Sequence, residues 1–214
     1  MTMTICRMMA IPTMMLLAIG GTVSVPSVAQ PVKTAPKPAK TLDIAGIRPG
    51  MKTADAVALL QRTGWTVRAN PGDSWAEVVA DAVARRRDQM PPNSARSGVY
   101  SYSAAKGEES VSLNVTPTPD GGRVGLVQYR APQAGRSYEQ IRAEVIARYG
   151  PSIYGPRQRV LIAPQGKLGE TMSLEVDSTG MHLTLSPSSA ADREARALVD
   201  RAVTARLGAV GTSF

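Results

Sequence analysis

The sequence predicts an α+β domain in which helices pack on one face of an antiparallel sheet. Two segments begin with a capping box, Ser74–Glu77 and Ser137–Gln140, and continue with apolar residues at helical spacing. Other segments alternate apolar and polar residues, which is typical of strands with one buried face. Short turns separate these strands, and strands joined in this way pair antiparallel. Helices combined with such hairpins define the α+β class.

Four helices are expected. Thr53 is placed to cap the first helix and Gly64 to end it. The second helix ends in three consecutive arginines, whose charge suits the negative end of a helix dipole, and two prolines then prevent its continuation. The expected ranges are Thr53–Thr63, Trp75–Arg87, Tyr138–Tyr149 and Ala190–Leu207.

Strands are expected on both sides of the third helix. Those before it form a three-stranded meander of Val99–Ser103, Val111–Thr116 and Arg123–Arg130. Those after it are Arg159–Ala163, Thr171–Asp177 and Met181–Ser186. Nearer the N-terminus, Leu42–Ile47 is a short strand, Trp65–Val67 a short extended piece and Asn70–Asp73 a turn. Each group of three strands follows a helix, so two halves of similar layout are an open possibility.

Residues 1–29 are typical of a cleavable signal peptide. Arg7 precedes an apolar run from Met8 to Val25, and Ser27-Val28-Ala29 supplies the small residues that signal peptidase recognises. Cleavage would leave Gln30 as the first residue. An uncleaved membrane anchor is the alternative, although the run has only the minimum length for a span. The expected location is therefore the periplasm or the medium into which the protein is secreted.

Residues 30–41 are predicted to be a Pro/Lys-rich linker, and residues 42–214 a single α+β domain. The linker cannot bury apolar surface, and its prolines favour an extended, solvated chain. Cys6 is the only cysteine and precedes the apolar run, so it is not placed for lipidation at the cleavage point. The mature chain therefore has no disulfide, no cysteine nucleophile and no transmembrane segment.

The chain is basic, with a formal net charge of +8 at pH 7. Basic proteins attract anions, and outside the cytoplasm these are lipid head groups, cell-wall polymers and acidic proteins. We therefore expect an envelope protein or an anionic envelope component as partner. A nucleic acid is not expected, because the location disfavours it and the charge forms no concentrated stripe.

The residue types used in catalysis are placed as surface groups. His182, the only histidine, alternates with apolar residues and is predicted to lie on the exposed face of its strand. Glu175 and Asp177, with Glu170 nearby, approach a hairpin turn and are interpreted as solvated charges. No catalytic residue, metal site or cofactor is therefore predicted.

A binding face is the functional feature that the sequence does suggest. Arginine and tyrosine interleave over residues 123–159, and this mixture is typical of interface hot spots. The candidate residues are Arg130, Tyr154, Arg157 and Arg159, the last three around a Gly-Pro loop. The alternative is that these arginines cover the edge of the core with their stems and reach water with their head groups.

One segment resembles a known family. Residues 44–57, IAGIRPGMKTADAV, place a glycine-methionine pair before a polar residue and an acidic-apolar helix start. Over about 20 residues this resembles the opening of the SmpA/OmlA (BamE-like) domains, compact α+β modules of the cell envelope. The present chain lacks a lipidated cysteine and has a longer C-terminal part. The resemblance implies a non-enzymatic envelope protein that works through protein contacts.

Together these observations favour a non-catalytic periplasmic module for protein binding or envelope assembly. Two alternatives remain open at this stage. One is a hydrolase of unknown substrate, which would have to use carboxylates because cysteine is absent and histidine is single. The other is a structural protein that its positive charge holds to an anionic envelope polymer or lipid.

Overall fold

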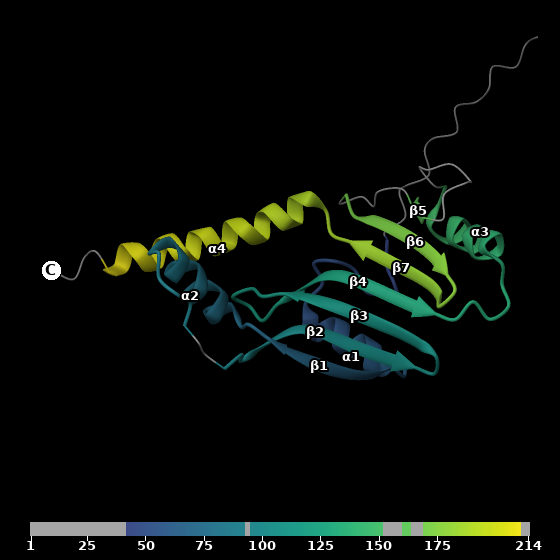
Figure 1. Ribbon diagram of the computed structural model, residues 1–214, viewed down its shortest axis with the longest axis horizontal. Coiled ribbons are helices and arrows are strands. Elements are labelled where there is room, and N and C mark those ends of the chain that lie inside the picture. Colours follow the sequence, from purple (N-terminus) through teal and green to yellow (C-terminus); the bar gives the residue numbers. More distant parts are fainter. Residues whose placement is uncertain (1–41, 93–94, 152–159, 164–168, 211–214) are drawn as a thin grey trace, which may run out of the picture. The chain divides into compact units, whose positions relative to one another are not determined.

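The computed structural model describes residues 42–92, 95–151, 160–163 and 169–210 (Figure 1). These residues belong to one compact unit, Pro38–Phe214. The described helices are α1 (Thr53–Arg62), α2 (Trp75–Arg86), α3 (Tyr138–Tyr149) and α4 (Ser189–Val210). The described strands are β1 (Thr66–Gly72), β2 (Gly98–Lys106), β3 (Glu109–Thr116), β4 (Arg123–Ala131), β5 (Val160–Ala163), β6 (Thr171–Asp177) and β7 (Gly180–Ser186).

The strands form one antiparallel sheet in the order β1-β2-β3-β4-β7-β6-β5. The predicted α+β class is confirmed, as is the meander of β2, β3 and β4. Each half of the chain folds inward, so that its last strand, β4 or β7, lies at the centre of the sheet. The two central strands pair with each other, with Val127 opposite Leu185 and Tyr129 opposite Leu183. This order gives the two halves a similar layout.

One face of the sheet is apolar and carries α1 and α3. Leu113 on β3, Val127 on β4 and Leu185 on β7 are fully buried on this face. The same cluster includes Leu60 from α1 and Ile141 from α3, so both helices cover one side of the sheet. The opposite face carries the alternate side chains, which are mostly serine, threonine, asparagine and glutamine, as the period of two requires.

The prediction of a strand at Leu42–Ile47 is wrong. Ile44 and Ile47 exchange backbone hydrogen bonds of 3.0 and 2.9 Å across a two-residue turn, in which Ala45 and Gly46 have φ values of 52° and 79°. Positive φ at both positions is the signature of a type I′ turn. Because the chain reverses there, both isoleucines point into the core, with exposures of 2% and 0%.

The turn predicted at Asn70–Asp73 is also wrong, because β1 continues through Asn70 and Pro71 to Gly72. The register shifts at this point, and an edge strand with a bulge tolerates a proline there. The Asn70 amide donates hydrogen bonds of 3.0 Å to the hydroxyls of Ser101 and Ser103, which replace local turn contacts. A Cβ on Gly72 would lie 2.4 Å from the Tyr100 nitrogen, so glycine is required for this close pairing.

The first helix begins differently from the prediction. Lys52, not Thr53, is its N-cap residue and makes no side-chain capping bond. Thr53 is instead the first helical residue; its N–H donates to the carbonyl of Gly122 at 3.2 Å and its side chain is buried. The two predicted capping boxes are confirmed at Ser74 and Ser137.

Helices α2 and α4 pack mainly against each other (Figure 1). Arg86 on α2 and Asp200 on α4 form an ion pair of 2.6 Å that ties the two helices together. Only Val203 is fully buried among the described side chains of α4, so most of this helix lies at the surface. Within the described ranges, no helix combines the length and the apolar character needed to cross a membrane.

We predict that Glu77→Gln flattens the acid side of the stability profile. The Glu77 carboxylate accepts hydrogen bonds from the N–H of Ser74 at 2.7 Å and from its hydroxyl at 2.8 Å, and these bonds lower its pKa from 4.5 to about 2. A lowered folded-state pKa stabilises the fold above about pH 4.5, and this contribution is lost as the pH falls toward 2. Gln140 shows that glutamine can complete a capping box in this chain.

The measurement is the urea midpoint of wild type and Glu77→Gln at a series of pH values from neutral to strongly acidic. Wild type should lose more stability than the variant in the acidic window. Some slope should remain in the variant, because hydrogen bonds from Thr118 and Thr179 also lower the pKa values of Asp120 and Asp177. Equal losses in the two proteins would contradict the prediction.

Candidate functional site

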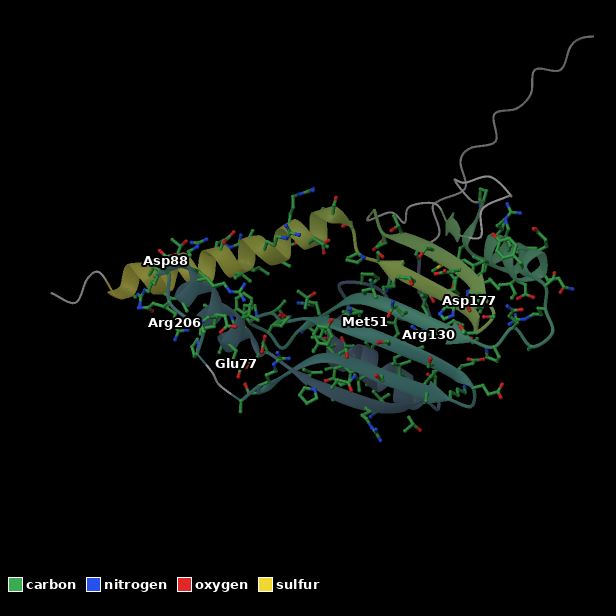
Figure 2. The ribbon with its side chains drawn as sticks, viewed as in Figure 1. Met51, Glu77, Asp88, Arg130, Asp177 and Arg206 are labelled. Carbon is green, nitrogen blue, oxygen red and sulfur yellow. The ribbon has the colours of Figure 1, made fainter. Side chains whose placement is uncertain are left out.

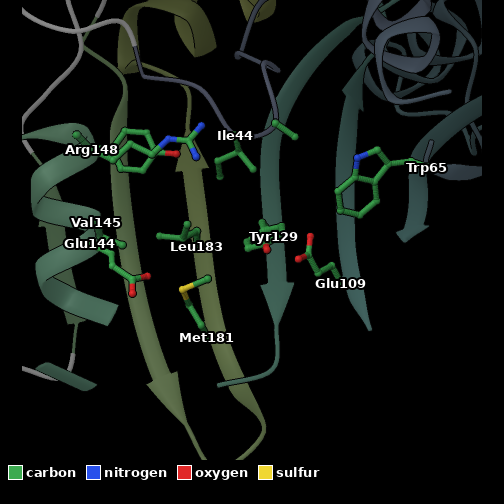
Figure 3. Close-up of a pocket in the computed structure, with 11 residues that line it drawn as sticks. Ile44, Trp65, Glu109, Tyr129, Glu144, Val145, Arg148, Met181 and Leu183 are labelled. Carbon is green, nitrogen blue, oxygen red and sulfur yellow. The ribbon is translucent and has the colours of Figure 1, made fainter. Parts of the chain in front are cut away.

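The candidate site is a pocket of about 290 Å³ on the apolar face of the sheet, where the two halves meet (Figure 3). Helix α3 forms one wall, and the side chains of Trp65 and Glu109 form the other. The turn at Ile44 and Ala45 closes the top. The full lining is Ile44, Ala45, Trp65, Glu109, Tyr129, Glu144, Val145, Arg148, Tyr149, Met181 and Leu183.

The floor is the seam between β4 and β7. Tyr129 on β4 lies opposite Leu183 on β7, and the next pair on this face is Ala131 and Met181. Leu183 and Met181 are each 7% exposed and line the pocket. The floor is therefore apolar, and only a small part of it faces the pocket between α3 and the N-terminal turn.

The top of the pocket is anchored to α3. The Tyr149 hydroxyl donates a 2.9 Å hydrogen bond to the backbone carbonyl of Asp43. The Arg148 guanidinium lies 5.2 Å from the centre of the Tyr149 ring and 3.7 Å from the Asp43 carboxylate. The two contacts with Asp43 hold the N-terminal segment against α3 at the upper edge of the pocket, while the cation–π contact lies within the helix.

Glu109 and Tyr129 form a polar pair at one wall. Burial raises the pKa of Tyr129 to about 12, and the charge and hydrogen bonding of Glu109 act in the same direction. The Tyr129 hydroxyl therefore stays protonated at physiological pH and acts as a hydrogen-bond donor, not as a base. Figure 3 shows the Tyr129 hydroxyl and the Glu109 carboxylate facing each other.

Glu144 supplies a second carboxylate from the α3 wall. It is exposed and accepts a 2.8 Å charged hydrogen bond from Arg136. Two carboxylates and the Arg148 guanidinium thus surround an apolar floor. Such a site can accept an apolar group with a cation beside it. It is poorly suited to acid–base catalysis, because both carboxylates lie in water instead of in environments that differ in polarity.

The predicted binding residues are not brought together at this pocket. Arg130 is exposed and points to the polar face of the sheet, on the side opposite to the pocket, between Ser110 on β3 and His182 on β7. Tyr154, Arg157 and Arg159 lie outside the described residues. The binding face proposed for these four residues remains a prediction.

His182 lies on the face opposite to the buried Met181 and Leu183, as predicted, but its side chain is only 22% exposed and therefore partly buried. Its Nε2 lies 3.0 Å from the Thr179 hydroxyl and 3.5 Å from the Asp177 carboxylate. In a catalytic triad the hydroxyl and the carboxylate contact different nitrogens of the histidine ring. Here the Thr179 hydroxyl and the Asp177 carboxylate both lie nearest the same nitrogen, Nε2 of His182. The cluster closes the β6–β7 turn, where Thr179 donates to Asp177 at 2.6 Å.

The carboxylates near this hairpin divide into two kinds. Glu175 and Asp177 are exposed, as predicted. Glu170 is not a surface group, because it is only 4% exposed and its Oε2 has no hydrogen-bond partner among the described residues. It lies beside a cleft that Arg48, Lys52 and Arg123 also line.

Sequence reasoning missed the pocket residues. The signal for Tyr129 was present, because Val127, Tyr129 and Ala131 alternate on one face of β4 and one of them carries a hydroxyl. No sequence pattern marks Glu109 or Glu144 as a pocket residue, because a glutamate at the start of a strand or on a helix is usually an ordinary surface group. Among the described residues, no group of three or more histidine, cysteine or acidic side chains could hold a metal ion.

Comparison with protein-family models, with curated proteins and with solved structures finds no match to this chain.

We predict that Glu109→Gln lowers the pKa of Tyr129 from about 12 without returning it to 10. The substitution removes the charge of Glu109, while burial, the largest cause of the shift, remains. The measurement is an ultraviolet titration of each protein against its own Tyr129→Phe variant, which isolates this tyrosine from the others. Glu108→Gln, in the adjacent turn, is the matched control and should leave the titration unchanged. A shift of equal size in the control would show that Glu109 has no special role.

Proposed function

We propose that this protein is an exported, non-catalytic binding module of the cell envelope and that the pocket at the β4–β7 seam anchors a protein partner. The observation that carries the proposal is the pocket itself, in which polar walls surround a floor that includes the largely buried Met181 and Leu183. Interfaces commonly combine such an apolar centre with a polar rim. A pocket of about 290 Å³ lies at the small end of the range for ligand sites and has room for one or two side chains.

The charges at the rim indicate which partner segment fits. Glu109 and Glu144 lie on opposite walls, and Arg148 lies above them. We expect a segment with one large apolar side chain beside a lysine or arginine. Its apolar side chain would lie on the floor of the pocket, and its basic side chain would pair with a carboxylate at the rim. The partner expected here is therefore an envelope protein with a basic-apolar loop or tail, and not a nucleic acid.

A carboxylate-based hydrolase is the second candidate, because the pocket does hold two carboxylates on facing walls. Hydrolysis would require one of them to act as an acid and the other as a base or nucleophile. The exposed positions of both, and the ion pair between Glu144 and Arg136, favour binding over turnover. We therefore rank the enzyme below the binding module.

We predict that a photo-crosslinker at Glu144 captures one discrete envelope protein in the exporting cell. The position lines the pocket, so a docked partner would lie within reach of the probe. Position Glu139, on the exposed surface of the same helix, is the matched site and should give no such product. The captured protein is then purified and titrated against the wild-type chain.

Charge reversal tests whether the rim recognises that partner. Glu109→Lys with Glu144→Lys should weaken binding by at least about tenfold, because two attractive contacts become repulsive. Glu108→Lys with Glu139→Lys makes the same change in net charge next to, but outside, the pocket, and binding should persist. Equal affinity of both double variants would remove the pocket from the interface, and release of a covalently altered product would favour the hydrolase.

Export itself is testable through the N-terminus. We predict that mass spectrometry of the native protein finds a chain that begins at Gln30 and occurs outside the cytoplasm, since Ala29 ends the expected cleavage site. Replacing Ala29 by a bulky residue should retain the longer precursor, because signal peptidase requires a small side chain there. A cytosolic protein that still carries Met1 would overturn the export proposal.

A further inference from the structure

The end of the α2–α4 pair carries a concentration of positive charge. Helix α2 ends with Arg85 and Arg86, followed by its C-cap residue Arg87. The last part of α4 adds Arg201 and Arg206. We call these five arginines, with Asp88, Met90 and Asp200, the basic tip. Figure 2 labels Asp88 and Arg206 at this end of the helix pair.

The two helices end at the same side, so their arginines belong to one surface. The 2.6 Å ion pair between Arg86 and Asp200 places the last turn of α2 beside the second half of α4. Asp88 and Asp200 are the acidic residues of the tip, against five arginines, so its net charge is +3. Within the described ranges, neither Arg85 nor Arg87 forms an ion pair, so both head groups are available to an anion.

An exposed apolar side chain follows the arginines at the end of α2. Met90 is 91% exposed, the highest value among the large hydrophobic side chains of the described part of the chain. It follows Arg87 by three residues and precedes Pro91, which ends any further helix. A single positive side chain is enough to interact favourably with the negative end of a helix dipole, and α2 ends with three arginines. The dipole also gives no reason for the exposed Met90.

We propose that the basic tip docks on an anionic lipid surface, with the arginines at the head groups and Met90 in the interface. A cluster of arginines with an exposed apolar side chain three residues beyond Arg87 has the composition of a peripheral membrane contact. An acidic protein would also attract the arginines, but a protein interface usually buries a larger apolar patch than one methionine. This inference does not use the pocket and holds whether or not that pocket binds a partner.

The geometry of the pair suits such a contact. Helix α2 has 12 residues and spans about 18 Å, so it carries the tip well away from the strand end at which it begins. Helix α4 continues to Val210 at the same side. The tip can therefore touch a flat surface while the sheet remains in solution.

The experiment is flotation of the purified exported chain with two kinds of vesicle, pure phosphatidylcholine and phosphatidylcholine that contains phosphatidylglycerol. We expect binding to the anionic vesicles only, and its loss when salt screens the charges. Arg85→Glu with Arg87→Glu should reduce partitioning by at least about tenfold, since each cation near the surface contributes about fivefold. Met90→Ser should reduce it by about threefold through the lost apolar contact.

Arg62→Glu with Arg68→Glu is the matched control. These arginines are exposed on α1 and β1, and their reversal changes the net charge of the chain by the same amount as the tip variant. The control should float like wild type, and circular dichroism should show all variants folded. Equal loss in the control would attribute binding to total charge and overturn the proposal. Wild type that floats with neither vesicle, or binds only an acidic polymer, would overturn it as well.

Discussion

The pairing of β4 with β7 is the interaction on which the rest of the structure depends. Each half of the chain forms a meander of three or more strands with an apolar face that its own helices cover only in part. Joining the last strands makes one sheet of seven strands and one continuous core, to which Val127 and Leu185 contribute from opposite halves. A chain without disulfides in its described part relies on such burial, at about 25 cal/mol for each Å² of apolar surface.

The same pairing creates a gap that the N-terminal turn fills incompletely. Helices α1 and α3 lie over different halves of the sheet, and the seam lies between them. Ile44 lines the pocket at this seam, and the Tyr149–Asp43 hydrogen bond holds the neighbouring residue against α3. The part of the seam over Tyr129 and Leu183 forms the pocket. The site is thus a consequence of how two partly covered halves are joined.

The elements that the sequence predicts well are those that local chemistry determines. Capping boxes at Ser74 and Ser137, and the alternation in β3, β6 and β7, need no information from distant residues. The turn at Ala45-Gly46 was not predicted, because apolar and polar residues alternate only weakly over Leu42–Ile47. So short a pattern fits one strand and the two sides of a tight hairpin equally well. Asn70-Pro71 was missed because its partners, Ser101 and Ser103, lie about 30 residues away.

The pocket could not be predicted for a related reason. Its residues come from segments that meet only through the strand order, and a single sequence does not reveal that β4 lies beside β7. Burial is the main cause of the raised pKa of Tyr129, and Glu109 adds to it although the two residues are 20 positions apart, because β3–β4 pairing brings their side chains together. Arg130, which the sequence did single out, belongs to the opposite face because one step along a strand reverses the direction of the side chain.

The net charge of the chain conceals two regions of different character, and their separation makes both proposals compatible. A protein of formal charge +8 would repel a basic segment if its charge were spread evenly. Here the rim of the pocket holds two carboxylates and one arginine, while five arginines gather at the basic tip. The length of α2, about 18 Å, exceeds the Debye length of about 8 Å in physiological salt, so the tip contributes little to the potential beyond the start of that helix. A lipid surface and a basic segment can therefore be recognised by one small basic protein, because each meets only the charges within a few ångströms of its own site.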